Sequence, residues 1–396
     1  MPSRGESART NAGPAVLNLI RRHDGVSRTE LARRTNMSAQ AISKIVARLV
    51  DEGLVWESGT QSVGVGKART RLSIIPQSRF ALGIHLDRSE AFVCLVNLAG
   101  DVQSSTQLEY PSVPSGPETV ALLSLAVNGL LETDEAIRPR LAGCGIGMAG
   151  PVDHRTGIAT APNNFAGWRD IPLASMLSEK IGIPVAIDKE TNMAMLSEHW
   201  QAPRKGWNVV IYVGTGIGAA WTIDGEVYRG SHSDAGEFGH TVIDLDGPLC
   251  VCGRHGCVEV FTSPAAVVQK YDLATGKSDS SSKPVAWNSQ TTAQLAEIAG
   301  LARRGDAQAR ASLYESGYYL GISAANLVTL LDIDNVTLAG PMLEAVGPHY
   351  LLGVEDGFLI TETDPQRSAQ ISVSPDLHSE RIASGAAFLF LNRVGT

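Results

Sequence analysis

The segment GEFGHTVIDLDGPLCVCGRHGC, residues 236–257, contains three of the five cysteines of the chain within eight positions. One nitrogen and three sulfurs, the ligand set of a closed tetrahedral zinc site, are offered by His240, Cys250, Cys252 and Cys257. A redox-active thiol pair and a chance cluster are the alternatives, but a histidine beside three cysteines favours a metal. Because four protein ligands leave no open position, we expect a structural zinc that holds the loop and does not activate water.

Two acidic residues lie next to the predicted zinc ligands. Glu237 precedes His240 by three positions, and Glu259 follows Cys257 by two. A loop held by zinc would keep both carboxylates in fixed positions, where they could accept hydrogen bonds from the vicinal hydroxyls of a sugar. On these residues alone, two solvated acids are the simpler interpretation.

A glycine-rich turn, Gly214-Thr215-Gly216-Ile217-Gly218, lies upstream of this segment. Glycines allow backbone N–H groups to approach a phosphate or a sugar hydroxyl closely. Such turns are also common in strand hairpins, and taken alone this one favours a structural role.

The composition predicts a folded protein of two or three domains. The chain has 396 residues, 43% of them hydrophobic and 19% charged. Its N-terminal residues are too polar for a signal peptide, and the apolar run at residues 122–131 is too short for a membrane span. We therefore expect a cytoplasmic protein without a membrane segment, in a reducing compartment that disfavours disulfides.

Charge is distributed unevenly, and the basic N-terminal part has the pattern of a helix-turn-helix. Residues 1–80 carry a net charge of +7 and the remainder −15, so we expect only the first part to contact a polyanion. The pattern predicts helices at 16–23, 27–35 and 38–53, with Ser27 and Ser38 as N-caps of the second and third.

The third of these helices would read DNA. Its N-terminal side chains, expected near base edges, are Ser38, Ala39, Gln40, Ser43 and Lys44. Gln40 is the best candidate for base recognition because an amide can pair with adenine at two positions. Arg48, one turn later, is better placed for phosphate.

Two strand-like runs follow around a glycine-rich tip and complete a winged helix. Lys67, Arg69 and Arg71 would line the wing beside the DNA backbone or minor groove. A three-helix interaction module with an ordinary charged surface is the alternative.

The rest of the chain has the pattern of a duplicated α/β unit. Residues 79–105 read as three strands joined by turns, and residues 207–230 repeat that rhythm. Helical sequence follows each meander, so we expect two lobes with a cleft between them.

Together with the residues described above, several longer motifs of the sequence resemble the ROK family, whose name stands for repressors, open reading frames and kinases. The motifs that carry the resemblance are AGEFGH (235–240), GPLCVCGRHGCVEVFTS (247–263), YVGTGIGAAWTIDGEVYRG (212–230), GIGMAGPVDHRTGIATAPNNFAGW (145–168) and VTLAGPMLEA (336–345). The resemblance covers nearly all of residues 80–396. It implies a winged helix-turn-helix followed by a two-lobed, actin-like body of the sugar-kinase type.

The resemblance also implies domain boundaries and ligands. It implies a DNA-binding domain at 1–78, a first lobe at 79–195 and a second lobe at 196–396, with the C-terminal helix returning to the first lobe. It further implies zinc at the four residues named above and a monosaccharide in the cleft. The implied sugar-binding residues are Asn163, Glu190, Glu237, His240 and Glu259.

Two positions depart from the pattern of the family kinases. The Asp-x-Gly-x-Thr motif that approaches ATP phosphates corresponds to His85–Ser89, where Asp87 replaces the glycine. The Asn-Asp pair that supplies the catalytic base corresponds to Lys189 and Glu190. The extra methylene of Glu190 displaces its carboxylate, and a shift of about 1 Å can cost on the order of a hundredfold in rate. We therefore expect a sensor and not an enzyme.

The sequence thus predicts a sugar-responsive repressor of carbohydrate transport or catabolic genes. Its expected partners are a palindromic double-stranded DNA operator, a monosaccharide or sugar-phosphate effector, and further copies of itself in a homodimer or homotetramer. A sugar kinase that retains a DNA-binding head, and a regulator that responds to another protein, are the alternatives.

Overall fold

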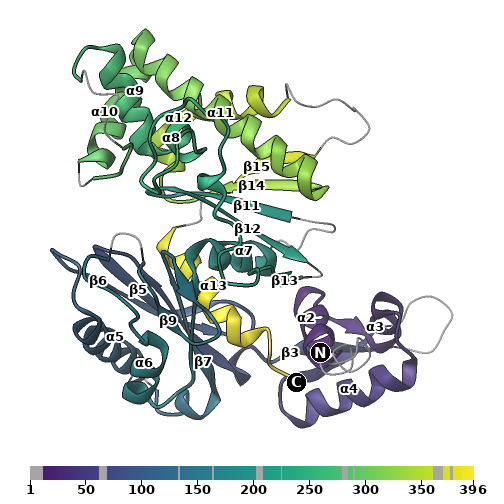
Figure 1. Cartoon of the computed structure of the whole chain (residues 1–396). Helices are drawn as coiled ribbons and strands as arrows, with labels where there is room; N and C mark the ends of the chain where they lie inside the picture. The colour runs from purple at the N-terminus through teal and green to yellow at the C-terminus, as the bar shows by residue number, and fades with distance from the viewer. Residues whose placement is uncertain are drawn as a thin grey trace. The chain divides into compact units, whose positions relative to one another are not determined.

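The computed structural model describes residues 12–61, 69–132, 134–162, 165–201, 208–223, 225–278, 284–288, 290–359, 369–374 and 378–396. The chain forms two compact units, one of Met1–Lys189 with Ile382–Thr396 and one of Glu190–Arg381 (Figure 1). Among the described residues, no helix is both long and apolar enough to cross a membrane.

The first unit begins with a winged helix. Its elements are α2 (Ala12–Arg22), β1 (Val26–Ser27), α3 (Arg28–Thr35), α4 (Ala39–Asp51), β2 (Val55–Gln61) and β3 (Arg69–Ile74). The three strands form one antiparallel sheet in the order β1-β3-β2. The predicted helix-turn-helix and wing are therefore confirmed, with the first helix starting four residues before the expected position.

Local sequence signals explain where α3 and α4 begin. Ser27 Oγ accepts a hydrogen bond from Glu30 N at 3.3 Å, and Ser38 Oγ accepts one from Ala41 N at 3.2 Å. Both predicted N-caps are thus confirmed, and each satisfies a backbone donor that the first helical turn leaves unpaired. Asn36 turns the chain between the helices in the left-handed conformation, with φ of 54°. Buried residues on α2, α3 and α4 form the small core, among them Ile20, Leu31, Ile42 and Leu49.

A five-stranded sheet follows in the same unit. It has the order β10-β7-β4-β5-β6 and is built from β4 (Phe80–Leu86), β5 (Glu90–Asn97), β6 (Val102–Glu109), β7 (Leu141–Met148) and β10 (Val185–Lys189). Strands β4, β5 and β6 pair antiparallel, whereas β7 and β10 run parallel to β4. Shorter elements are η1 (Pro76–Ser78), η2 (Arg138–Arg140), β8 (Val152–Asp153) and β9 (Ile158–Ala159).

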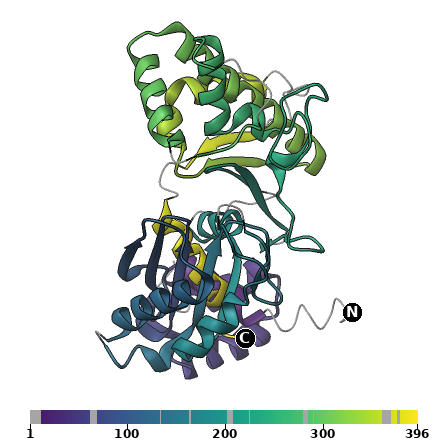
Figure 2. The ribbon, with the colours of Figure 1, turned by 60° about the vertical axis from the view of Figure 1, so that its left-hand side comes forward.

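Helices cover both faces of this sheet (Figures 1 and 2). The helices α5 (Gly116–Leu131) and α6 (Leu173–Ile181) pack on one face through a shared hydrophobic cluster. The other face receives α13 (Ser379–Leu391), whose backbone at Ala383 and Ala386 would overlap any Cβ at Gly83 and Gly145. The chain therefore ends on the first unit, although the segment before Ile382 belongs to the second.

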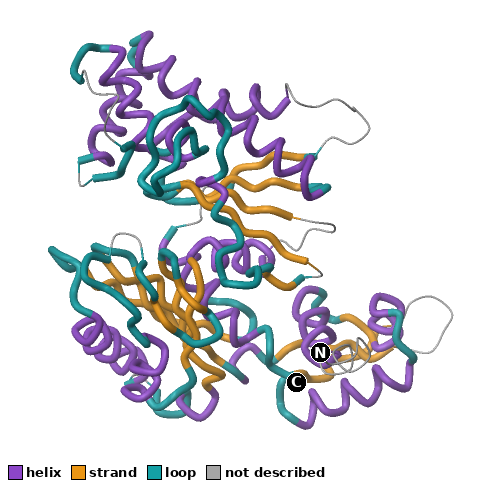
Figure 3. The backbone as a smooth tube through the Cα atoms, in the orientation of Figure 1, coloured by secondary structure: helices purple, strands orange, loops and turns teal. Residues whose placement is uncertain are grey.

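The second unit repeats the same topology. Its sheet has the order β13-β12-β11-β14-β15 and consists of β11 (Asn208–Val213), β12 (Ile217–Ile223), β13 (Glu226–Val227), β14 (Asn335–Ala339) and β15 (Gln370–Val373). Again three strands form an antiparallel meander and two strands add in parallel. Figure 3 shows the strands in orange and the helices that surround them in purple. The predicted duplication of an α/β unit is confirmed by this match of strand order and direction.

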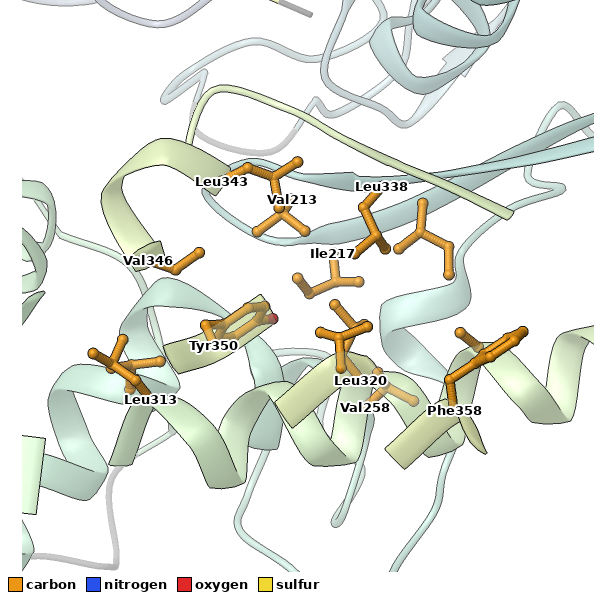
Figure 4. Packing of buried hydrophobic residues seen from close by; sticks show 14 of the residues in the cluster. Val213, Ile217, Val258, Leu313, Leu320, Leu338, Leu343, Val346, Tyr350 and Phe358 are labelled. Carbon is orange, nitrogen blue, oxygen red and sulfur yellow. The ribbon is translucent and has the colours of Figure 1, made fainter. Parts of the chain in front are cut away.

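The helices of the second unit place the candidate site. They are α7 (Glu190–Gln201), η3 (Phe238–His240), α8 (Glu259–Thr262), α9 (Pro264–Ala274), α10 (Thr291–Arg303), α11 (Ala307–Leu331) and α12 (Leu343–Leu359). One large apolar cluster joins β11 and β14 to α11 and α12, with the fully buried Tyr350 among Val346, Leu313 and Leu320 (Figure 4).

The two long helices α11 and α12 approach each other at glycines. A Cβ at Gly317 would overlap the carbonyl oxygen of Tyr350, and a Cβ at Gly353 would overlap that of Tyr314. Gly321 and Gly357 make the equivalent approaches one turn later. Contact between the two backbones is thus possible only because both helices lack side chains along this line.

Candidate functional site

The backbone of residues 236–240 lies against strand β12. Gly236 has φ of 92°, and a Cβ there would overlap the carbonyl oxygen of Ala219. The N–H of Ala219 donates to Gly236 O at 2.9 Å, which ties the segment to the strand. Glu237 and His240, at the two ends of η3, are thereby positioned by the sheet of the second unit.

Glu259 reaches the same strand from α8. Its Oε2 accepts a hydrogen bond from the N–H of Ile217 at 3.0 Å. A Cβ at Gly216 would overlap this oxygen, so only glycine at that position allows the contact. The glycine-rich turn therefore binds the carboxylate of Glu259, a residue of the same chain. This is a structural role, which is what the sequence favoured for the turn.

Burial raises the pKa of Glu259, although the Ile217 N–H and the His240 ring act in the opposite direction. The negative charge of Glu237 adds to the upward shift. These three side chains thus interact electrostatically. Together they present carboxylate oxygens and an imidazole ring at one place, which suits hydrogen bonds to several hydroxyl groups.

Of the other two predicted sugar-binding residues, the structure describes Glu190. Glu190 is half-buried and is the first residue of α7. The next residue, Thr191, lies close to Gly218 on β12. A Cβ on Gly218 would lie 2.6 Å from the methyl group of Thr191. The N-terminus of α7 is therefore held beside the strand that carries the carboxylate contact. Asn163 lies outside the described residues.

The predicted metal ligands converge. The ligand atoms of His240, Cys250, Cys252 and Cys257 all lie within 4.8 Å of one another. The Sγ atoms of Cys252 and Cys257 are 3.6 Å apart, and Cys250 Sγ lies 3.5 Å from His240 Nδ1. With zinc–sulfur bonds of about 2.3 Å, two sulfurs of a tetrahedral site lie about 3.8 Å apart. All five cysteines are free thiols, and the donor set fits a zinc ion and not a disulfide.

Few regular elements hold this loop together. Between His240 and Glu259 the structure has isolated bridges, at Val242 with Cys257 and at Leu249 with His255. The sulfur-bearing residues Cys250 and Cys257 are buried in a small cluster with Phe261. A metal joined to these four residues would add cross-links to the backbone hydrogen bonds of the loop.

In the winged helix, the predicted base-reading residues share one exposed face. The residues Ser38, Ala39, Gln40, Ser43 and Lys44 are all exposed on α4, whereas Ile42 and Val46 of the same helix are buried. The N-terminal end of α4 therefore presents exposed and mostly polar residues, as a recognition helix requires.

The residues predicted to contact phosphate lie in different environments. Arg48 donates from Nη2 to the carbonyl oxygen of Gly395 at 2.6 Å, and its Nε lies 3.6 Å from Glu52. Arg71 is exposed on β3, and its guanidinium packs against Gly25. The backbone of Arg69 pairs with Gln61 in the wing, and Lys67 lies outside the described residues.

The sequence did not indicate the contact between the C-terminal segment and the winged helix. Besides the Arg48 bond, Asn18 Nδ2 donates to Asn392 Oδ1 at 3.4 Å, and Gly395 packs near Leu49 of α4. No local signal could reveal a contact between residues more than 340 positions apart.

The turn at Asp87–Glu90 is closed by hydrogen bonds of its backbone, of the Asp87 side chain and of Tyr110. Asp87 Oδ1 accepts a hydrogen bond from Arg88 N at 2.7 Å, and Asp87 N donates to Glu90 O at 2.9 Å. The Tyr110 hydroxyl donates to the Asp87 and Glu90 carbonyl oxygens, and burial raises its pKa. The Asp87 carboxylate thus accepts the backbone N–H of Arg88 within this turn.

Comparison with known proteins matches these features. The model of the ROK family matches residues 81–392. The chain belongs to the ROK family. In addition, the MarR family model matches residues 14–60, within the winged helix. The ROK match covers the body of the chain, and the MarR match covers much of the N-terminal winged helix.

Two proteins named as repressors are similar to most of this chain. The xylose repressor of Caldicellulosiruptor bescii is 29% identical over 332 residues, which are 82% of this chain and 81% of that protein. The DNA-binding transcriptional repressor Mlc of Escherichia coli is 26% identical over 387 residues, 96% of this chain and 92% of its own.

Solved structures have the same fold. A ROK-family transcriptional regulator described as a homolog of Escherichia coli MLC superposes with a TM-score of 0.79 at 21% identity, over 98% of this chain and 97% of that one. The ROK hexokinase of Thermus thermophilus gives 0.65 at 26% identity, over 78% of this chain and 96% of its own. The kinase match stops short of the whole chain, whereas the regulator match includes the winged helix.

Proposed function

We propose that this ROK-family protein is a sugar-responsive, DNA-binding transcriptional repressor of carbohydrate transport or catabolic genes. The observation that carries the proposal is the exposed polar face at the N-terminus of α4, on a winged helix joined to a ROK body. The relatives named as repressors support the same function. The proposal places the protein in the cytoplasm, with a palindromic operator bound by a homodimer or homotetramer.

The effector in this proposal is a monosaccharide or a sugar phosphate. Its hydroxyl groups are bound by Glu237, His240 and Glu259, with Glu190 and Asn163 as further contacts. Support comes from the shared positioning of the first three by β12. Binding changes the affinity for DNA to the extent that the ligand prefers one conformation over the other.

Zinc is the proposed cofactor, held by His240, Cys250, Cys252 and Cys257. Its function is structural, because the loop that it cross-links runs between the proposed sugar-binding residues Glu237 and Glu259. His240 offers Nδ1 to this cluster, at 3.5 Å from Cys250 Sγ, so its ring connects the metal centre with the sugar site.

We further propose that the body is a sensor and not a kinase. The Asp87 carboxylate occupies the N–H of Arg88, and its charge would repel a phosphate at this turn. ATP-dependent phosphate transfer to hexoses, measured with a coupled assay, should be absent. Appreciable transfer that is abolished by Glu190→Gln would contradict this part of the proposal.

The test of the repressor proposal is selection of bound DNA. Purified protein is incubated at moderate salt with fragmented DNA of its source, and the retained fragments are sequenced. We expect enrichment of one palindromic site beside genes for sugar transport or catabolism. Recovery of random fragments would contradict the proposal.

Replacement of Gln40 by alanine should relax operator specificity. A bidentate pair of an amide with adenine contributes about 1–3 kcal/mol of discrimination, so we expect the preference at one base position to fall by roughly 10- to 100-fold. Binding titrations with the operator and its single-base variants measure this, with Gln308→Ala, an exposed glutamine in the other unit, as control. Unchanged discrimination in Gln40→Ala would remove that residue from base recognition.

Substitution of Lys67 or Arg69 should act differently. Loss of one phosphate contact weakens binding to all sequences alike and reduces the slope of log affinity against log salt by about 1. The same titrations at several salt concentrations provide the measurement. A sequence-dependent loss would argue for a base contact in the wing.

Glu259→Gln should weaken effector binding by about 10- to 100-fold, because loss of a charged hydrogen-bond partner costs about 1.5–3 kcal/mol. Gly216→Ala should have a similar effect, since its methyl group displaces the carboxylate. Calorimetry with a panel of pentoses, hexoses, N-acetylhexosamines and their phosphates measures both. Glu297→Gln, on the exposed side of α10, is the matched control. Wild-type affinity in both site variants would place the effector elsewhere.

A further inference from the structure

A cavity of about 340 Å³ lies within the first unit, apart from the proposed sugar site. It is lined by the end of α4, the segment after the wing, the start of β7 and the C-terminal residues. Residues of the winged helix, the first lobe and the C-terminal segment therefore meet around the cavity. Its volume falls within the range of about 300–1,000 Å³ that is typical of small-molecule sites.

Positive charge dominates the side chains of this cavity. Three arginines line it, Arg79, Arg140 and Arg393, against two carboxylates, that of Glu52 and the terminal one of Thr396. The Glu52 carboxylate is itself 3.6 Å from Arg48 Nε, so part of its charge is already balanced. A cavity with this lining attracts an anion.

Arg140 is held in place by neutral groups. Its Nε donates to Ala136 O at 2.8 Å and its Nη1 to Gln77 O at 2.7 Å, while its guanidinium carbon lies 5.1 Å from the centre of the Phe80 ring. Carbonyl oxygens and a ring do not neutralise the cation. The Asp134 carboxylate is 3.9 Å from Nη2 and exposed, which makes it a weak, screened partner.

Arg79 and Arg393 approach from other segments. Arg79 donates to the carbonyl oxygen of Ser78 at 2.8 Å, which again leaves its charge in place. Arg393 is exposed, two residues after the end of α13. The three guanidinium groups therefore come from the linker, the first lobe and the C-terminal segment. An anion bound to all three would cross-link these segments.

The position of the cavity argues against DNA as the occupant. Glu52 follows the C-terminal end of α4, whereas the base-reading residues lie at its N-terminal end. A helix of 13 residues is about 20 Å long. The cavity is thus a full helix length away from the groove that α4 would enter.

We propose that this cavity binds a small phosphorylated metabolite, whose phosphate group pairs with Arg79, Arg140 and Arg393. Guanidinium groups suit this role because they bind phosphate oxygens in a bidentate manner. The bound phosphate fixes the winged helix on the first lobe and so sets its orientation toward DNA. This second ligand acts independently of the sugar bound in the other unit.

Calorimetry on the full chain tests the proposal. Inorganic phosphate and a panel of pentose and hexose phosphates are titrated at constant ionic strength, with chloride as the reference anion. We expect wild-type binding in the submillimolar range and at least tenfold weaker binding by Arg393→Ala and by Arg79→Ala. Arg393→Lys should retain part of the affinity, and Arg303→Ala, an exposed arginine on α10, should retain all of it.

The outcomes separate the possible ligands. Equal affinity for inorganic phosphate and sugar phosphates supports a site for the phosphate group alone, and tighter sugar phosphates identify the metabolite class. No heat with any phosphate, or unchanged affinity in both arginine variants, overturns the proposal. Displacement of phosphate by operator DNA would assign the cavity to the DNA backbone and would also overturn it. Glu259→Gln should leave phosphate binding intact, so failure of the sugar site is a separate result.

Discussion

Replacement of Cys257 by serine should abolish binding of the proposed zinc and unfold the loop between His240 and Glu259. Cys257 is fully buried, and its sulfur lies 3.6 Å from that of Cys252. Structural zinc sites in small domains contribute roughly 10–16 kcal/mol of apparent binding free energy at pH 7, much of it as folding free energy. We therefore expect near-zero zinc content by elemental analysis, a lower Tm for the second unit, and loss of effector binding.

The effect should reach the proposed sugar site because the loop is continuous with it. His240 belongs both to this cluster and to η3, and the Glu259 carboxylate, which accepts a hydrogen bond from Ile217 N, lies two residues beyond Cys257. Cys94→Ala, which removes a buried thiol from the first unit, is the control for the loss of any cysteine. Treatment of the wild type with a chelator, followed by zinc, should reproduce and then reverse the defect. Full stability and effector binding without metal would contradict a structural zinc.

Short-range signals explain why the winged helix and the metal cluster could be predicted from the sequence. The caps at Ser27 and Ser38 act on backbone groups three residues away, and the helix boundaries follow from them. Cys250, Cys252 and Cys257 lie within one short loop, so their sulfurs can converge without long-range folding. The fold of the body was indicated by the repeated strand meander and by the family motifs.

Contacts that depend on how elements cross could not be predicted in the same way. Gly216 reads as an ordinary turn glycine, and only the structure shows which atoms would overlap a side chain there. The Arg48 side chain looked suited to phosphate, but it bonds to Gly395 through a contact set by the whole path of the chain. The three arginines of the cavity are likewise separated by long stretches of sequence, and no spacing rule brings them together.

The close approach of α11 and α12 leads to a second large effect. Replacement of Gly353 by alanine should destabilise the second unit, because the added methyl group overlaps the carbonyl oxygen of Tyr314 and lies 2.9 Å from Tyr318 N. Both neighbours are backbone atoms of a long helix, so they cannot move without separating the helices along their whole contact. Overpacking of this kind costs about 1–3 kcal/mol, and more where the backbone cannot yield. Urea unfolding should show a lower midpoint, with Gly317→Ala giving a similar loss on the opposite helix.

Gly129→Ala provides the matched control, since it is the same substitution in a helix with a different outcome. Gly129 is exposed in α5, and a Cβ there meets nothing within 4 Å. Alanine is favoured over glycine within a helix by about 1 kcal/mol, so this variant should be slightly more stable than the wild type. The opposite signs of the two changes separate helix propensity from helix packing. If Gly353→Ala were as stable as Gly129→Ala, the contact between α11 and α12 would not limit the stability of the second unit, and the apolar cluster around Tyr350 would have to hold the helices by itself.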